Sequence, residues 1–306
     1  MAVLNPPRTL PGLGRAVVNY LLEARRTLNE DELLATFKPE GLNPCVNAGD
    51  GLLNTISSLR AINVLRTDGE GALQVGDRLG GVKAPLDTTQ FRLVLQEHVF
   101  DLRRDGDVWV SQPGDGHTSG ARDLNRALTW VLAQDALGQP LSWTDNVQTL
   151  QAQQFSTSNN ESWPISNDTR WLANVRWAIA LGLATPSVMK DKSGVVPLPV
   201  VAVADAISRI APDRYSVREL LANLGGAVPV LHGGVLRTGL VSVLGSDPDP
   251  GVAQECADSS VGQSLRILED QGKLQFETLP DAEGIRLSRF DATRQTHVIV
   301  KAGGKN

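Results

Sequence analysis

One pattern recurs three times along the chain, and it constrains the fold more than any other feature. Each copy is a helical segment that runs through a turn into two short strands. In each copy, apolar residues recur at the three- and four-residue spacing of an amphipathic helix, and an arginine stands among apolar residues near the helix end. The copies cover residues 49–74, 168–197 and 259–288, and their arginines are Arg60, Arg176 and Arg266. The sequence therefore predicts three related modules.

In the first module the repeated stretch follows two more helical segments. Asn29 stands directly before the second of these helices and Glu32 three residues later, which is the spacing of a capping box. The prolines of residues 1–12 predict an extended arm before the first helix. We expect helices over 13–26, 30–37 and 50–63, and strands over 64–66 and 72–75. The order of three helices and two strands is that of a winged helix-turn-helix.

The second and third modules repeat this order with longer connections. In the second we expect helices over 120–135, 142–155 and 168–184, the middle one capped by Ser142, and a hairpin around a turn at 191–194. In the third we expect a helix over 200–211, a second that starts at a Ser216 cap with Glu219 at capping-box spacing, and helices over 233–244 and 259–274. A hairpin around a turn at 281–284 and a further strand from the tail at 297–306 complete this module. We therefore predict a mainly α fold with small β wings, built as three tandem winged helix-turn-helix modules over residues 1–106, 107–198 and 199–306.

The charge of the chain bears on nucleic-acid binding. The net charge is −5, and no segment is strongly basic. Tight non-specific binding of duplex DNA depends on neutralising phosphates, so this balance argues against it. A protein with a negative net charge can still contact DNA through a local surface that carries arginines.

Cysteine content and apolar runs indicate where the protein works. The two cysteines, Cys45 and Cys256, cannot form a disulfide framework or a four-ligand zinc site. The first ten residues lack the apolar centre of a signal peptide, and no apolar run reaches the ~18 residues of a membrane span. We expect a cytoplasmic protein without membrane contact.

No catalytic pattern stands out. The four histidines, His98, His117, His232 and His297, have no second His or Cys at ligand spacing. Nucleophile motifs such as G-x-S-x-G do not occur in the sequence. We therefore expect no metal site, no cofactor and no enzymatic activity.

DNA contact would come from the N-terminal half of each third helix and from the wing, because these parts of such proteins reach bases and phosphates. The candidates are Asn54, Ser57 and Arg66 in the first module, Arg170, Asn174, Lys190 and Lys192 in the second, and Gln263, Arg286 and Arg289 in the third. Asp50 and Asp68 disfavour phosphate beside the first module. We expect DNA near Arg170, Lys190 and Lys192, and a packing or docking role for the first module.

Two short motifs open the chain, Leu4-Asn5-Pro6-Pro7 and Leu10-Pro11-Gly12-Leu13-Gly14, and a helix leads from them into the first module. This opening, in a chain of 306 residues, resembles the DpdG family. The resemblance implies an accessory protein of the bacterial gene clusters that insert 7-deazaguanine derivatives into DNA and restrict DNA lacking them. It implies no catalytic residues.

Together these features favour a non-enzymatic subunit of a DNA modification and restriction system in phage defence. Such a subunit would bind DNA, partner proteins of the assembly, or both, and an ATPase or helicase is the expected kind of partner. Two alternatives stay open. One is a protein-interaction scaffold without DNA contact, because the tandem winged-helix subunits that clamp SMC-type ATPases are similar in fold. The other is a transcriptional regulator.

Overall fold

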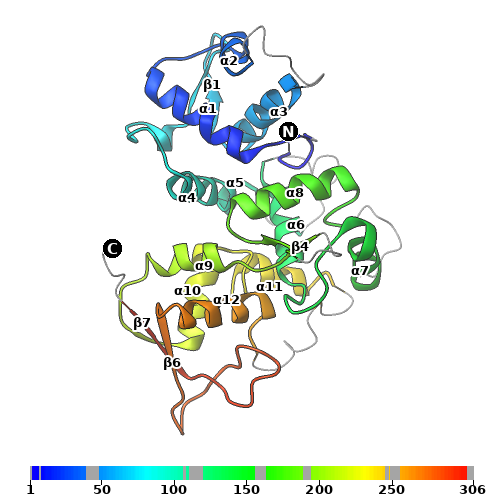
Figure 1. The fold of residues 1–306 in the computed structure, drawn as a ribbon, viewed down its shortest axis with the longest axis vertical. Coiled ribbons are helices and arrows are strands. Elements are labelled where there is room, and N and C mark those ends of the chain that lie inside the picture. Colours follow the sequence, from blue (N-terminus) through cyan, green and yellow to red (C-terminus); the bar gives the residue numbers. More distant parts are fainter. Residues whose placement is uncertain are drawn as a thin grey trace. The chain divides into compact units, whose positions relative to one another are not determined.

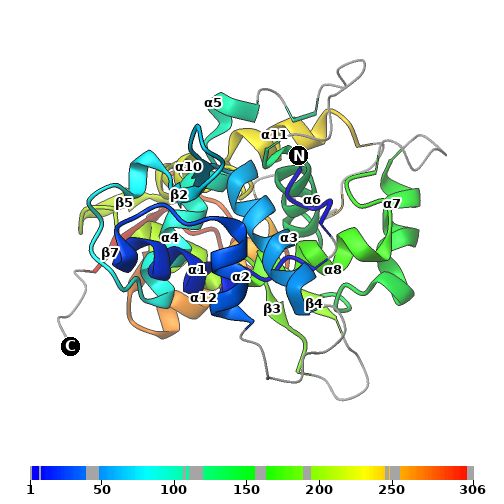
Figure 2. The ribbon, with the colours of Figure 1, turned by 90° about the horizontal axis from the view of Figure 1, so that it is seen from above.

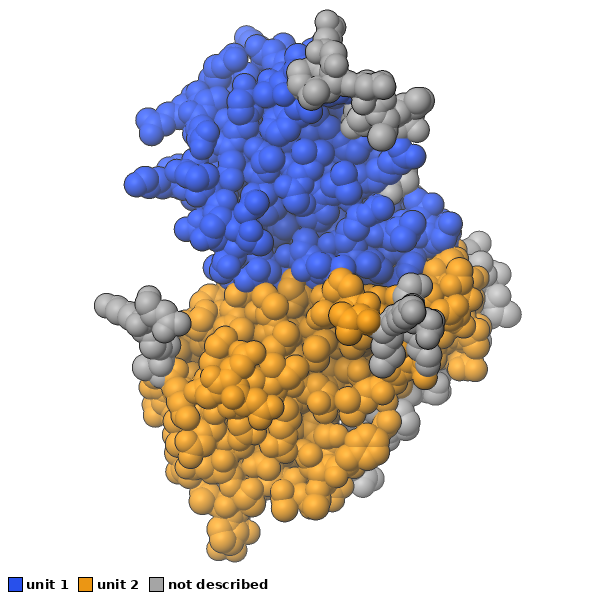
Figure 3. All heavy atoms as spheres, in the orientation of Figure 1, with its two compact units in different colours: residues 1–125, 167–181 blue, residues 126–166, 182–306 orange. Residues whose placement is uncertain are grey.

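The protein is mainly helical, with small antiparallel sheets (Figure 1). The computed structural model describes residues 2–6, 8–38, 48–105, 108–109, 120–155, 163–188, 194–244, 248 and 256–301. These residues group into two compact units (Figure 3). Unit 1 consists of residues 1–125 and 167–181, and unit 2 of residues 126–166 and 182–306. The predicted mainly α fold with small sheets is thus confirmed.

Unit 1 contains the first predicted module and one helix from later in the chain. That helix, α8, contacts α1. The elements of unit 1 are α1 (Pro11–Ala24), α2 (Glu30–Phe37), α3 (Ala48–Ala61), β1 (Leu65–Thr67), β2 (Leu73–Val75), the 3-10 turn η1 (Asp77–Leu79), α4 (Thr88–Val99), α5 (Leu102–Asp105) and α8 (Asp168–Ala180). The boundary at residue 125 falls within α6 (Arg122–Leu132).

Helix starts in unit 1 follow from local capping chemistry. Asn29 Oδ1 accepts from the Glu32 N–H at 2.7 Å, and Glu32 Oε2 accepts from the Asn29 N–H at 3.1 Å, which confirms the predicted capping box. Asp87 and Gln90 form a second capping box at the start of α4. Helix α1 begins at Pro11, earlier than predicted. A proline is tolerated at the first helical position, because its missing N–H would have no partner there.

The residues before α1 form an arm that packs inside unit 1. Ala2, Val3 and Leu4 are fully buried. Ala2 pairs with Gly120 in a parallel bridge, and the Leu4 N–H donates to Asp123 Oδ2 at 2.9 Å. The arm is therefore part of the core of unit 1.

Unit 2 contains most of the second and third predicted modules. Its elements are the π-helical turn η2 (Trp143–Val147), α7 (Gln148–Gln154), β3 (Thr185–Pro186), β4 (Val195–Val196), α9 (Val200–Ile207), β5 (Arg214–Ser216), α10 (Val217–Ala227), α11 (Val235–Val241), α12 (Ser259–Asp270), β6 (Leu274–Glu277) and β7 (His297–Val300). Figures 1 and 2 show β5 and β7 lying next to α10, which both strands contact.

The predicted caps of unit 2 differ in outcome. Ser216 caps α10 as predicted, and its Oγ accepts from the Glu219 N–H at 3.1 Å. Ser142 precedes η2 but makes no capping hydrogen bond with its side chain. Its hydroxyl instead contacts Thr144 Oγ1 at 3.1 Å, so Ser142 stands at the predicted N-cap position of η2 but does not cap it through its side chain.

The third wing also departs from the prediction. Strand β6 pairs with β7, not with the residues just after the turn at 281–284, and β7 lies between β5 and β6. Val298 and Val300 on β7 are buried, as the alternation of a half-buried strand requires. The residues after the turn pack on α12 instead. A Cβ at Gly262 would lie 1.7 Å from the Leu287 carbonyl oxygen, so this close approach depends on glycine.

The same strand order occurs three times. In each copy the residue or strand after the first helix pairs with the last strand, and the last strand pairs with the strand that follows the third helix. The three sets are Leu28–β2–β1, Leu141–β4–β3 and β5–β7–β6, and every pairing is antiparallel. The internal repeat read from the sequence is thus matched by a repeated sheet topology.

Candidate functional site

The predicted DNA-contacting residues of the first module are half-buried or paired. Asn54 and Ser57 on α3 are half-buried, and Ser57 has a partner within the protein. Arg66 on β1 is exposed and forms an ion pair with Asp77. The guanidinium nearest to this wing is therefore neutralised by a carboxylate of the protein itself.

In the second module the structure corrects one residue and leaves two undescribed. Asn174 is fully buried, so its side chain cannot contact DNA in this conformation. Arg170, one turn earlier on α8, is half-buried and donates to Asn5 Oδ1 of the arm. Lys190 and Lys192 lie outside the described residues.

The reason for the error at Asn174 is the orientation of α8. The sequence predicts a buried face through Trp171, Val175, Ala178 and Ile179, which leaves Asn174 at the surface; Trp171 and Ala178 are buried as predicted. The buried residues are Trp171, Ala173, Asn174, Trp177 and Ala178, and Ile179 is 40% exposed. The helix is therefore rotated toward Trp177, which is fully buried.

The third module places its candidates on α12 and in the segment between β6 and β7. Gln263 on α12 and Arg286 are half-buried. Arg289 is exposed, donates to Asp135 Oδ2 at 2.8 Å and lies 4.9 Å from the ring centroid of Phe290. Within this module, too, the exposed arginine is paired with a carboxylate of its own unit.

The shared arginines of the three third helices differ in environment. Arg60 pairs with Glu30 at 3.3 Å, and Arg266 pairs with Glu269 at 3.1 Å and with Asp291 at 3.0 Å. Arg176 on α8 instead lines a cleft in unit 1. The ion pairs of Arg60 and Arg266 favour a structural role for these two arginines.

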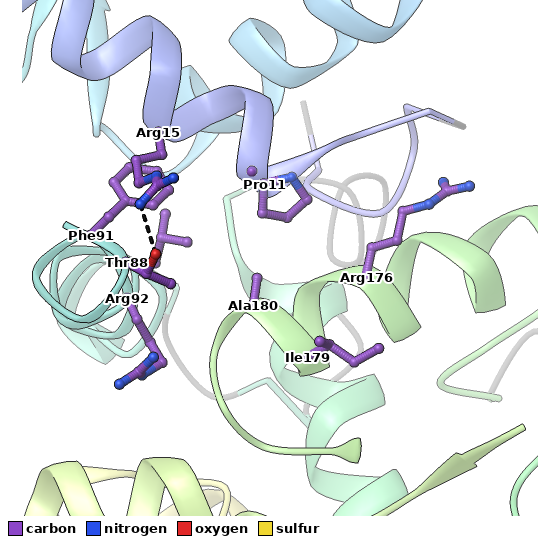
Figure 4. Close-up of a pocket in the computed structure, with 10 residues that line it drawn as sticks. Pro11, Arg15, Thr88, Phe91, Arg92, Arg176, Ile179 and Ala180 are labelled. Carbon is purple, nitrogen blue, oxygen red and sulfur yellow. Dashed lines mark hydrogen bonds between the residues drawn. The ribbon is translucent and has the colours of Figure 1, made fainter. Parts of the chain in front are cut away.

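The cleft to which Arg176 belongs is formed by α1, α4 and α8, all in unit 1, and we name it the α1–α4–α8 cleft (Figure 4). Its volume is about 450 Å³. Its apolar lining consists of Pro11, Phe91, Leu95, Ile179 and Ala180. Its polar lining consists of Arg15, Thr88, Arg92 and Arg176, and Gly12 completes it.

The arginines stand around the margin of this cleft. Arg15 Nη1 donates to Thr88 Oγ1 at 2.7 Å, which fixes one guanidinium over the start of α4 (Figure 4). The side chains of Arg92 and Arg176 extend outward from α4 and α8 in the same view. Because Arg15, Arg92 and Arg176 come from three separate stretches, no spacing rule could have united them.

Each unit contains a buried carboxylate, Asp123 in unit 1 and Asp258 in unit 2. Burial raises the pKa of Asp123 from 3.8 to about 6, although the Leu4 N–H and the charge of Arg170 act in the opposite direction. Burial also raises the pKa of Asp258. The interactions with His232 and Arg237 lower it by more, so the pKa of this carboxyl lies below its ordinary value. Arg237 binds Asp258 through two hydrogen bonds, of 2.9 and 3.0 Å.

The described histidines make hydrogen bonds within the fold. His98 Nδ1 lies 2.8 Å from the Ile62 carbonyl oxygen, and burial lowers the pKa of this ring. His232 Nδ1 accepts from the Asp258 N–H at 3.2 Å, and His297 Nδ1 lies 3.1 Å from Thr296 Oγ1. Among the described residues, no group of three or more His, Cys, Asp or Glu side chains could hold a metal ion. Within the ranges that the structure describes, no helix is long and apolar enough to cross a membrane.

The elements define a class of mainly helical proteins with a triplicated arrangement of helices and small antiparallel sheets. A family model described as DpdG-like matches residues 1–282, and the chain belongs to this family. The resemblance seen at the N-terminus thus extends over nearly the whole chain. The family is a component of 7-deazaguanine DNA modification systems. No curated protein and no solved structure matches the chain.

Proposed function

We propose that the protein is a non-enzymatic winged-helix subunit of a 7-deazaguanine DNA modification and restriction system, and that it binds DNA and partner proteins of that system. The observation that carries the proposal is the threefold repetition of one strand order. Leu28–β2–β1, Leu141–β4–β3 and β5–β7–β6 each follow the helix order of a winged helix-turn-helix. We assign the modules to residues 1–106, 107–198 and 199–306.

The charged side chains favour different binding partners for the three modules. In the first and third modules, Arg66 and Arg289 are already paired with Asp77 and Asp135. Binding a phosphate there would require breaking an ion pair, so these modules suit contact with proteins. The second module keeps the candidate lysines of its turn, Lys190 and Lys192, for DNA.

A non-catalytic role is supported by the use of the reactive side chains. His98, His232 and His297 hydrogen-bond to groups of the fold, and Cys256 is buried. A general base or nucleophile must reach a substrate atom, and of these described side chains His98 and Cys256 are buried away from one.

The test is the binding of a short DNA duplex as a function of salt, measured by fluorescence anisotropy. We expect a log–log slope steeper than about −3, because several phosphates would be bound. The double variant Lys190→Gln/Lys192→Gln should weaken binding and reduce the slope by about 2, since each lysine would neutralise one phosphate. Lys273→Gln, an exposed lysine after α12, serves as the control and should change little.

A second candidate function is a scaffold that binds proteins and does not touch DNA. It is favoured by the internal pairing of Arg66 and Arg289, and by Phe290, which is 71% exposed beside Arg289. Exposed aromatic side chains of this kind often anchor protein interfaces. Absence of salt-dependent duplex binding, together with binding of an ATPase or helicase of the same system that Phe290→Ala abolishes, would select this function.

A further inference from the structure

We propose that the protein binds duplex DNA without reading its base sequence. The inference rests on the proposed function, because it specifies how the DNA of that proposal is recognised. In a winged helix-turn-helix, side chains on the N-terminal half of the third helix reach the base edges, and this half must protrude into the major groove. The third helices of the three modules are α3, α8 and α12, and the environment of their N-terminal halves carries the inference.

The N-terminal half of α12 is enclosed within unit 2. Five of its first six residues are buried, and the sixth, Gln263, is half-buried. The Ser260 hydroxyl donates to the Leu132 carbonyl oxygen at 2.7 Å, and Ser259 Oγ accepts from the Ala136 N–H at 2.8 Å. The end of α6 and the residues that follow it therefore contact the start of α12, where a base-reading helix would have to be free.

The segment between β6 and β7 packs against the same half of α12. A Cβ at Gly262 would lie 1.7 Å from the Leu287 carbonyl oxygen, so the backbone of this segment touches the helix. Leu287 is itself fully buried. The major groove is about 12 Å wide and admits a helix only where no other chain lies alongside the part that enters. Helix α12 is therefore a packing helix of unit 2.

The N-terminal half of α8 makes its contacts within unit 1. Trp171, Ala173 and Asn174 are buried. Arg170 is the only Lys or Arg in the first seven residues of the helix, and its guanidinium donates to Asn5 Oδ1 of the arm. The one cation on this half of α8 thus binds the arm of unit 1.

The exposed side chains on these helix halves suit neither a phosphate nor a base edge. Asp50 on α3 and Asp168 on α8 are exposed carboxylates in the first turn of their helices, where they repel the phosphates that flank the groove. Leu172 on α8 is 51% exposed, but its side chain has no hydrogen-bonding group.

The arginines of α3 and α12 stand in the C-terminal halves of these helices and are already paired. Arg60 pairs with Glu30, and Arg266 pairs with Glu269 and Asp291. The first seven residues of α3 and the first six of α12 contain no Lys or Arg. Arginine and lysine make the commonest specific contact with a base, the paired hydrogen bonds to guanine, so α3 and α12 lack that contact where it would be needed.

Phosphate contacts alone then hold the duplex. Such contacts position a protein on DNA but carry no sequence information. The net charge of −5 keeps this binding weak, and we expect a Kd of about 10⁻⁴–10⁻⁶ M at physiological salt, the range of non-specific binding. Selection of a site on the DNA is then left to partner proteins.

The experiment is a selection by the full chain from a pool of duplexes with a randomised centre, at one fixed salt concentration. We expect no common motif after several rounds, and selected duplexes that bind within about threefold of the starting pool. A base-reading protein binds its own site at least about a thousandfold more tightly than other DNA, so the two outcomes are well separated.

Two variants test the helices directly by fluorescence anisotropy with a duplex from the pool. Asn54→Ala and Gln263→Ala remove the partly exposed amides of α3 and α12, the kind of side chain that reads adenine. We expect each to change the Kd less than about twofold, whereas loss of a base-reading amide would weaken binding about fivefold or more.

The outcomes separate this inference from the proposed function. A common motif that binds more than about threefold tighter than the pool would overturn the inference and leave DNA binding standing, and so would a fivefold loss in Asn54→Ala or Gln263→Ala. Absence of duplex binding at every salt concentration would overturn both. Equal binding of all sequences, with the steep salt dependence of phosphate contacts, would support both.

Discussion

Asp123 is a carboxyl group enclosed within unit 1, where it holds the N-terminal arm. It accepts from the N–H groups of Leu4 at 2.9 Å and of Leu124 at 2.8 Å. Burial nevertheless raises its pKa from 3.8 to about 6, so the folded state binds a proton more tightly than the unfolded state. The stability that this group contributes is therefore greatest below pH 4 and is lost as the pH rises through 6.

We expect this linkage to appear in the pH dependence of unfolding. Between pH 4 and pH 7 the free energy of unfolding should fall by about 2 kcal/mol on account of Asp123, since each pKa unit corresponds to about 1.4 kcal/mol and the unfolded carboxyl is already half ionised at pH 4. Asp123→Asn should remove this part of the slope, whatever it does to stability at a single pH. The measurement is urea denaturation at several pH values, with Asp270→Asn, exposed on α12, as the control. Parallel curves for the parent and Asp123→Asn would contradict the prediction.

Arg237 on α11 compensates a buried charge at the start of α12. It forms two hydrogen bonds with Asp258, and both side chains are almost fully buried. Arg237→Met should lower the free energy of unfolding by about 3–5 kcal/mol, because it leaves a buried carboxylate without its partner. Arg218→Met, which removes an exposed pair of 3.6 Å with Glu283, should cost less than about 1 kcal/mol. Denaturant unfolding of the two variants compares them directly, and equal losses would argue against the special role of Arg237.

At the scale of elements, Gly262 decides how the segment after the third turn packs on α12. A side chain there would meet the Leu287 carbonyl oxygen at 1.7 Å. Gly262→Ala should destabilise unit 2 by about 1–3 kcal/mol or more, as overpacking does. Gly226→Ala on α10, where a Cβ meets nothing within 4 Å, should be neutral or stabilise by up to about 1 kcal/mol. Thermal melts of both variants provide the test, and a neutral Gly262→Ala would show that the segment can move away.

The elements also show how far the sequence could predict the fold. The capping box of Asn29 and Glu32, the strands β1 and β2 and the Ser216 cap depend on neighbouring residues, and all were predicted correctly. The partner of β6 was not, because β7 is separated from it by about twenty residues and the nearer turn offered a simpler hairpin. The rotation of α8 was not predicted either, since it is set by tertiary packing of Trp177 and not by local pattern.

The same reasoning applies to the sites. The predicted DNA-contacting residues came from the geometry of winged helices in general. That general geometry does not predict that Asn174 is buried or that Arg66 is paired with Asp77. No signal in the sequence indicated the α1–α4–α8 cleft, because Arg15, Arg92 and Arg176 come from three separate stretches that line it only in the folded unit.

For the whole molecule, the question is where the chain can be divided. A fragment of residues 1–106 corresponds to the first predicted module, but unit 1 also contains residues 167–181. Helix α8 contacts α1, and the buried Gln96 on α4 donates to the Leu181 carbonyl at 3.0 Å. The arm residue Leu4 likewise depends on Asp123. A fragment of residues 1–106 would therefore expose apolar surface of α1 and α4 and lack the partners of buried polar groups.

We expect the fragment of residues 1–106 to unfold with weak cooperativity or to aggregate, whereas a fragment of residues 1–181, which contains all of unit 1, should show a cooperative transition. The physical reason is that an incomplete core lacks both apolar burial and hydrogen-bond partners. Far-ultraviolet circular dichroism during heating, combined with limited proteolysis, measures the difference. A cooperative transition of the shorter fragment, at the temperature of the longer one, would show instead that the first module folds independently and that α8 merely docks on it.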